Sequence, residues 1–293
     1  MEDDQGYLWI ATNTGVNKFD PTTERCTRYL HDPNNPNSLA GAYITSIARD
    51  SQGYFWFGTE ANGLDKLDPS TGIFTHYLKD SDGQFVGRIT QVIADSHRNI
   101  WFVGERGLFH LNQEAGQITR PPAISDRLSA ENVYEDDADN LWMLANTPIL
   151  ALVKYDRLAG RVTKYPLSTG AARVLASTTN GGSVNSNLVA DGQNGLWVPS
   201  SEGLYYFDRR SERFTYRFQH DESNSDSLDS NAILSVYRDR VVCSGWELRM
   251  RGSTFSISAK NSSPFIGIAR STPKVSQPAG SRRFMKMPTA FYG

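Results

Sequence analysis

The chain has 293 residues, of which 39% are hydrophobic and 11% aromatic, and this composition excludes a wholly disordered chain. Its net charge is -2, no apolar run approaches the length of a membrane span, and we expect no signal peptide at its start. Two cysteines, Cys26 and Cys243, are too few for a disulfide framework or a cysteine-rich metal site.

A tryptophan recurs along the chain, at steps of 47, 45, 41 and 55 residues. An aspartate stands six residues before each of them, and a Leu, Phe or Ile directly precedes the indole. Such a period marks repeated supersecondary units, because one unit cannot bury its apolar face alone. The repeat tryptophans are Trp9, Trp56, Trp101, Trp142 and Trp197.

The residues between Asp and Trp predict a tight turn. Three positions before the Trp stand Gly6, Gly53, Asp139 and Asn194, residue types that tolerate a positive φ. Arg98 breaks this rule, so we expect the third turn to be of another type. The Asp is expected to accept hydrogen bonds from the amides of its own turn. One carboxylate per unit does not make a metal coordination shell.

Each unit then continues through further short apolar segments. A Gly followed by an apolar residue comes first, then an apolar residue before an Asp or Asn, an alternating stretch and a closing apolar pair. Four short strands with turns between them are the pattern of a propeller blade. We therefore predict an all-β fold, a partial β-propeller of about five four-stranded blades over residues 1–240. The tryptophans would be blade-core residues; their equivalent positions argue against sugar stacking.

The fourth unit is the least regular. Pro148-Ile149 replaces the usual Gly and apolar residue, and the linker through Gly181-Gly182 is the longest in the chain. This irregularity fits either a loop that carries specificity or decay of the repeat.

Several phrases resemble the two-component regulator propeller repeat. They are the residues Asp50 to Thr59, Gly63 to Asp68, and the loop His31 to Leu39. The resemblance covers about residues 1–240 and implies the periplasmic sensor half of a membrane-anchored, dimeric receptor, such as a histidine kinase, hybrid regulator or diguanylate cyclase. The chain departs from the repeat where Gly-Thr would be usual, at Val103-Gly104, Leu144-Ala145 and Pro199-Ser200.

Residues 241–293 differ from the rest of the chain. They hold eight of its 30 Lys and Arg but one of its 32 Asp and Glu, and the repeat stops after Asp239-Arg240. We therefore expect an irregular basic tail. If the same DNA is read one base earlier, codon degeneracy permits three repeat motifs in register, with hidden tryptophans at positions 245 and 293. We infer that the tail is translated out of frame.

The alternative is a genuine basic segment that binds an acidic partner. At the other end, Met1-Glu2-Asp3 matches Glu135-Asp136 of a later unit. Both ends are therefore expected to lie inside a larger protein.

No known catalytic, nucleotide-binding or metal-binding motif occurs in the chain. We expect no catalytic residue, cofactor or metal ligand, and the sequence assigns no ligand-binding residue. Asp136-Asp137-Ala138-Asp139-Asn140 lacks the Gly and the distant Glu of a helical calcium loop. For the histidines we expect surface or turn roles; they are His31, His76, His97, His110 and His220.

The leading hypothesis is a non-enzymatic sensor module of a bacterial signalling receptor, whose cue is an unidentified small molecule or oligosaccharide, with no nucleic-acid partner. One alternative is a propeller enzyme like the lyases that inactivate streptogramin antibiotics, which needs a His/Glu pair at one channel mouth. A scaffold for protein partners is the other alternative, because the fold supports it equally.

Overall fold

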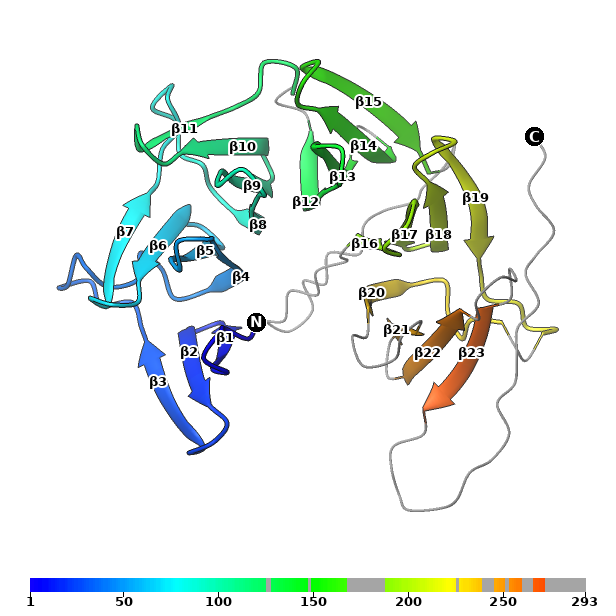
Figure 1. Ribbon diagram of the computed structural model, residues 1–293, viewed down its shortest axis with the longest axis horizontal. Coiled ribbons are helices and arrows are strands. Elements are labelled where there is room, and N and C mark those ends of the chain that lie inside the picture. Colours follow the sequence, from blue (N-terminus) through cyan, green and yellow to red (C-terminus); the bar gives the residue numbers. More distant parts are fainter. Residues whose placement is uncertain are drawn as a thin grey trace. The chain divides into compact units, whose positions relative to one another are not determined.

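The computed structural model describes residues 1–124, 128–146, 149–167, 188–224 and 227–238, and the strand backbone of 245–250, 253–259 and 266–271. Regular structure in these ranges is β-strand (Figure 1). Among the same residues, no helix is long and apolar enough to cross a membrane. The all-β prediction is confirmed.

Consecutive strands form antiparallel sheets, in chain order. The first sheet has three strands, β1 (Leu8–Thr12), β2 (Gly15–Asp20) and β3 (Arg25–Tyr29). Four four-stranded sheets follow it: β4 (Ile44–Arg49), β5 (Phe55–Thr59), β6 (Leu64–Asp68) and β7 (Ile73–Tyr77); β8 (Ile89–Ala94), β9 (Ile100–Gly104), β10 (Gly107–Asn112) and β11 (Gln117–Thr119); β12 (Ser129–Glu135), β13 (Asn140–Asn146), β14 (Leu150–Asp156) and β15 (Arg161–Pro166); β16 (Val189–Ala190), β17 (Gly195–Ser200), β18 (Gly203–Asp208) and β19 (Arg213–Phe218). These sheets are the predicted propeller blades.

In two of the four-stranded sheets, the repeat glycine is required at the start of the third strand, counted in chain order. Gly63 and Gly203 have a positive φ, and a Cβ there would clash with a carbonyl oxygen of the outer strand, that of Tyr77 or Phe218. A side chain would push the outer strand away, so the repeat keeps a glycine.

The five repeat tryptophans are buried, with exposures between 0% for Trp56 and 7% for Trp101. The rings of Trp9 and Trp56 pack between neighbouring sheets. The ring of Trp9 stacks on Phe55 of the second sheet, with centroids 3.9 Å apart. The cluster around Trp56 includes Ile100 and Phe102 of the third sheet. All five tryptophans are therefore core side chains.

Inner strands of consecutive sheets are joined by side-chain-to-backbone bonds. The hydroxyl of Thr45 on β4 donates to the carbonyl of Ile89 on β8 at 2.5 Å, and Thr90 on β8 donates to Ala130 on β12 at 3.0 Å. The side chain of the next residue on β4 and on β8 accepts a hydrogen bond from a backbone amide of the following inner strand. Ser46 Oγ accepts Val92 N–H at 3.0 Å, and Gln91 Oε1 accepts Val133 N–H at 2.8 Å. The same polar junction is thus built twice.

The chain divides into two compact units. One consists of Met1–Pro148, Val153–Lys164 and Thr178–Ser183, and the other of Ile149–Leu152, Tyr165–Ser177 and Val184–Gly293. The polar junctions above lie in the first unit. In the second unit, Trp197 packs in a cluster with Phe218, Ile233 and Val236.

The prediction of an irregular tail is wrong for part of residues 241–293. β20 (Ile233–Arg238) pairs with β21 (Gly245–Met250), followed by β22 (Ser253–Ala259) and β23 (Ile266–Ser271), in a four-stranded sheet. The physical reason lies in the sequence, because apolar and polar residues alternate over 246–250 and 255–258, the period of a strand. Residues 272–293 lie outside the described residues, and the reading-frame hypothesis stays a prediction.

The expectation for the third turn is also wrong. Arg98 adopts φ 67°, close to Asp139 at 61° and within the same left-handed region as Gly6 and Gly53. The fifth turn is the different one, since there the positive φ belongs to Gly192 (83°) and not to Asn194. Residue type at this position therefore favours but does not decide the turn. The irregular features of the fourth unit, Pro148 and Gly181-Gly182, lie outside the described residues.

Candidate functional site

The repeat aspartates are the first candidates, and their carboxylates bind their own turns. Asp50 Oδ1 accepts the amides of Gln52 and Tyr54, both at 3.0 Å. Its Oδ2 accepts the indole N–H of Trp56 at 2.8 Å. One carboxylate thereby closes the turn and orients the blade-core ring. This confirms the turn role and adds the indole bond, which the spacing did not predict.

Three further repeats share this arrangement. The indole bonds measure 2.8 Å from Trp9 to Asp3, 2.8 Å from Trp101 to Asp95 and 2.6 Å from Trp142 to Asp136. In the fifth repeat the hydroxyl of Tyr206 donates to Asp191 Oδ2 at 2.7 Å instead. Buried donors that point at the carboxylate make the turn specific for an ionised Asp.

The electrostatics of these groups follow from the same bonds. Burial alone would raise the pKa of Asp95, but hydrogen bonds from Asn99 and Trp101 outweigh it and lower the pKa. For Asp136 burial is again opposed by the bonds from Trp142 and Asn140, and its pKa is lowered. Both carboxylates remain ionised at neutral pH. The calcium-like run that begins at Asp136 is therefore a turn whose carboxylate is already bonded.

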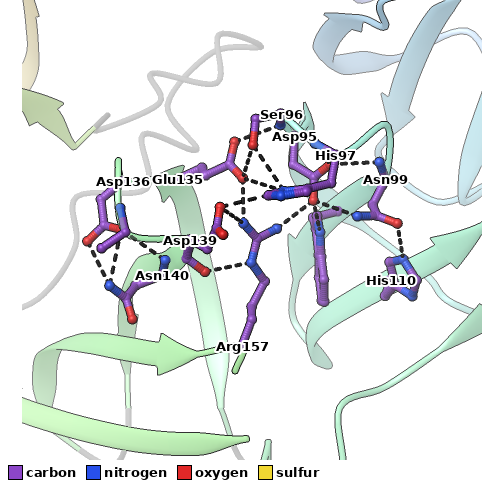
Figure 2. A network of polar contacts seen from close by, with 12 residues as sticks. Asp95, Ser96, His97, Asn99, His110, Glu135, Asp136, Asp139, Asn140 and Arg157 are labelled. Atoms are coloured by element: carbon purple, nitrogen blue, oxygen red, sulfur yellow. Dashed lines mark hydrogen bonds and ion pairs between the residues drawn. The ribbon is translucent and has the colours of Figure 1, made fainter. Parts of the chain in front are cut away.

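A larger polar network joins the turns of the third and fourth sheets around Arg157, which follows β14 (Figure 2). The guanidinium binds Asp95 Oδ2 and Glu135 Oε1, both at 2.5 Å, and Asp139 Oδ1 at 3.2 Å. Its Nε also donates to the carbonyl of Asp139 at 2.6 Å. Arg157 is thus a cation shared by three carboxylates.

Within this network, Asp95, His97 and Glu135 have ligand atoms close enough together to hold a metal ion. The geometry favours a structural role instead. Arg157 already supplies a positive charge to both carboxylates, and the hydroxyl and amide of Ser96 donate to Glu135 at 3.1 and 2.9 Å. A divalent ion would have to displace the guanidinium from partly buried partners.

The histidines take structural positions among the described residues. His76 bridges Asp65 Oδ1, at 2.7 Å, and the carbonyl of Pro36, at 3.0 Å. His110 lies against the Trp101 ring, with centroids 4.5 Å apart, and contacts Asn99 Oδ1 at 3.1 Å. His97 is exposed beside Asp139, at 3.5 Å. His97 has the expected exposed turn position, whereas the expectation is wrong for His76 on β7 and His110 on β10, which are half-buried strand residues held by neighbouring side chains.

The loops that begin at His31 and at His220 have the same internal bonding. His31 Nδ1 contacts the carbonyl of Leu39 at 2.6 Å, and His220 Nδ1 contacts that of Leu228 at 2.5 Å. The amides of Asp32 and Asp221 bind the hydroxyls of Ser38 and Ser227, each at 2.9 Å. Both loops are therefore built as self-supporting caps, and their outer residues are exposed.

Arg157 is the functional-site candidate that the sequence did not reveal. The only signal is the dipeptide Asp156-Arg157, because the first three repeats carry Pro21, Pro69 or Gln113 at that position. Arg209 shares the position and donates to the carbonyl of Gln193 at 2.5 Å. An arginine here ties its side chain to the Asp turn of its own sheet.

A comparison with protein families identifies the repeat. Residues 38–61, which span the end of the first cap loop, β4 and β5, match the family model described as two component regulator propeller. This segment is similar to the two component regulator propeller repeat. No curated protein matches it.

Solved structures share the propeller fold of this chain. The extracellular domain of a hybrid two component system from B. thetaiotaomicron is 18% identical, with a TM-score of 0.65 over 94% of this chain and 34% of that one. A second such domain from that organism is 18% identical, with a TM-score of 0.61 over 91% and 38%. PorZ, a surface component of the type-IX secretion system of Porphyromonas gingivalis, is 17% identical, with a TM-score of 0.57 over 83% and 36%.

The chain spans less than two fifths of the length of these structures. At these identities the likeness shows the fold, a partial propeller. What the parent protein senses or binds does not follow from it.

Proposed function

We propose that the chain is part of a non-enzymatic sensor region of a bacterial signal-transduction receptor. In the parent protein this region lies outside the cytoplasm, periplasmic in a two-membrane cell, and a membrane-anchored dimer couples it to a cytoplasmic output domain. Its cue is a small molecule or an oligosaccharide.

The match of residues 38–61 to the two component regulator propeller model carries this proposal. The location is supported by structural neighbours that are extracellular domains of two component systems. The sensor role of this chain and its coupling to an output domain are parts of the proposal.

The non-enzymatic part is supported by what the titratable groups do. Asp50, Asp95 and Asp136 bind their own turns and indoles, and Glu135 is held by Arg157 and Ser96. General acid–base catalysis needs groups that face a substrate and exchange protons near the working pH. Carboxylates committed to buried donors are poor candidates for that work.

Two alternatives stay open. A propeller lyase would need a His/Glu pair at one channel mouth, and the described His97–Glu135 contact, at 4.0 Å, lies in the Arg157 network. A protein scaffold is favoured by a different observation, the structural likeness to PorZ, a component of a secretion system.

The experiment uses the intact extracytoplasmic region of the parent. Its thermal unfolding is measured against a panel of small molecules and oligosaccharides, and each stabilising compound is recovered and analysed by mass spectrometry. A cue at 100 times its dissociation constant adds about 2.7 kcal/mol to the unfolding free energy. The sensor proposal expects stabilisation with the compound returned unchanged, and a matching change in output-domain activity in the full-length receptor.

Turnover of the stabilising compound would instead establish the lyase alternative. Stabilisation by a purified protein partner alone, with no response to any compound and no change in output, would establish the scaffold.

A further inference from the structure

The first cap loop, residues 31–39, lies along the outer edge of the second sheet. β7 is the edge strand of that sheet, and its Phe74 donates its N–H to the carbonyl of Asn37 in the loop, at 3.0 Å. Two residues further along β7, the Nε2 of His76 lies 3.0 Å from the carbonyl oxygen of Pro36. The loop is therefore held to β7 by a backbone bond and a side-chain bond.

The ring of His76 has an oxygen partner at each nitrogen. Its Nδ1 lies 2.7 Å from Asp65 Oδ1 on β6, while its Nε2 faces Pro36. The Asp65 side chain is 0% exposed, and its other oxygen accepts the N–H of Ala40 at 2.8 Å. A neutral imidazole has one N–H, so either neutral tautomer would leave a ring lone pair facing an oxygen. The two bonds together require the imidazolium.

The same ladder position holds a permanent cation in two other sheets. In three sheets, the residue two positions after the repeat glycine pairs with a basic residue of the outer strand; the pairs are Asn17 with Arg28, Asp65 with His76, and Tyr205 with Arg217. A guanidinium stays protonated throughout the physiological range, whereas an imidazole titrates within it. His76 therefore makes the charge at this position depend on pH in the second sheet.

The charge on His76 is governed by one carboxylate. Among the described residues, Asp65 is the charged group that acts on the ring, and its hydrogen bond raises the pKa of His76 against the effect of burial. The other titratable groups on the surrounding elements have partners of their own; they are His31 and Asp32 in the loop, Lys66 and Asp68 on β6, and Tyr77 on β7. A raised folded-state pKa means that the bonds are complete at low pH and are lost as pH rises through that pKa.

We propose that His76 is a proton-dependent latch for the first cap loop. As an imidazolium it holds the loop against β7. Loss of the Nε2 proton leaves a lone pair facing the Pro36 carbonyl, and the loop moves away while Nδ1–H keeps its bond to Asp65. Release uncovers the outward N–H of Phe74, at the edge of a sheet that stays folded.

Hydrogen exchange at Phe74 in the full chain tests this latch. NMR follows the protection of the amide, relative to its free rate at each pH, from about pH 5 to about pH 9. Protection should fall as pH rises through the folded-state pKa of His76, by about tenfold for each unit by which the latched pKa exceeds the released one. Ser81 is the internal control, because its N–H binds the carbonyl of Ile118 on β11 at 2.7 Å through backbone atoms alone. Its protection should not change with pH.

Three variants and one direct measurement complete the test. His76→Arg supplies the permanent cation of the first and fifth sheets and should keep Phe74 protected without a step. His76→Gln should also remove the step, whereas His220→Gln, in the second cap loop, should retain it. In the wild-type chain, nitrogen NMR should show both ring nitrogens of His76 protonated below the step. A flat profile at Phe74, an equal step at Ser81, a step that persists in His76→Gln, or a ring with one proton below the step would overturn the proposal.

Discussion

Trp56 donates its indole N–H to Asp50, six residues earlier, across 2.8 Å, and both side chains are buried. Through this hydrogen bond, a turn at the edge of one sheet fixes the position of a ring that packs against the next sheet. Local turn geometry and long-range packing therefore depend on one carboxylate.

Replacing Asp50 by Ala leaves the Trp56 N–H and two turn amides without their acceptor. We expect a loss of about 3 kcal/mol in unfolding free energy, since each buried unsatisfied donor costs about 1–3 kcal/mol. Asp68→Ala is the matched control, because Asp68 also accepts turn bonds, from Ser70, but is only partly buried. Urea titration of both variants checks this, and similar losses in the two would contradict the role of the indole bond.

Trp56→Ala should destabilise the chain by about 3–5 kcal/mol, the usual range for removing a large buried aromatic side chain. The ring is 0% exposed and shares its cluster with Ile100 and Phe102. Chemical denaturation measures the loss, and Trp56→Phe should recover part of it. A loss below about 1 kcal/mol would place the ring at the surface and reopen a stacking role for it.

His76 should make stability depend on pH. Its hydrogen bond to Asp65 raises the pKa of His76 above the ordinary 6.5, against the opposing effect of burial. A raised folded-state pKa means that this stabilisation is fully present below pH 6.5 and is lost as pH rises through the folded-state pKa. His76→Gln should flatten the unfolding free energy over that interval. An unchanged pH profile in the variant would show that the Asp65 bond is not coupled to folding.

The Arg157 network predicts a response to metal ions that depends on one residue. Zinc or EDTA should leave the thermal midpoint of the wild-type chain unchanged, because the guanidinium neutralises Asp95 and Glu135. Arg157→Ala should lose about 3 kcal/mol, since it leaves carboxylates without their cation. Zinc should then restore part of the loss through Asp95, His97 and Glu135.

Arg161→Ala is the control for this prediction, as Arg161 is exposed at the start of β15. It should change little and gain nothing from zinc. Stabilisation of the wild-type chain by zinc would mean that the ion competes with Arg157 for the carboxylates.

The regular part of the fold could be predicted from the sequence because it repeats. The equivalent Asp and Trp positions indicate a turn, the strand after it and a buried ring in each of the five repeats, although the fifth turn has its positive φ at Gly192. The conformation of Arg98 could not be predicted in this way. Its turn is closed by bonds to Asp95 from the His97 and Asn99 amides, and these outweigh the preference of an arginine for negative φ.

The candidate site was less predictable. Arg157 contacts Asp95, which is 62 residues away in sequence, so no local pattern signals the contact. The strands β21–β23 were missed because loss of the Asp turn outweighed a real alternation of apolar residues. The nucleotide sequence around codon 240 tests the reading-frame hypothesis, which strand assignment does not address.

The junction made by Thr45 and Ser46, and again by Thr90 and Gln91, has a direction. β4 supplies side chains to the backbone of β8, and β8 supplies side chains to the backbone of β12. Because the receiving groups are main-chain atoms, a unit with a Thr followed by a Ser or Gln at these positions can precede any other. Duplication or loss of a whole unit in the gene would therefore leave the remaining junctions intact, so the number of units can change during evolution without a redesign of each contact.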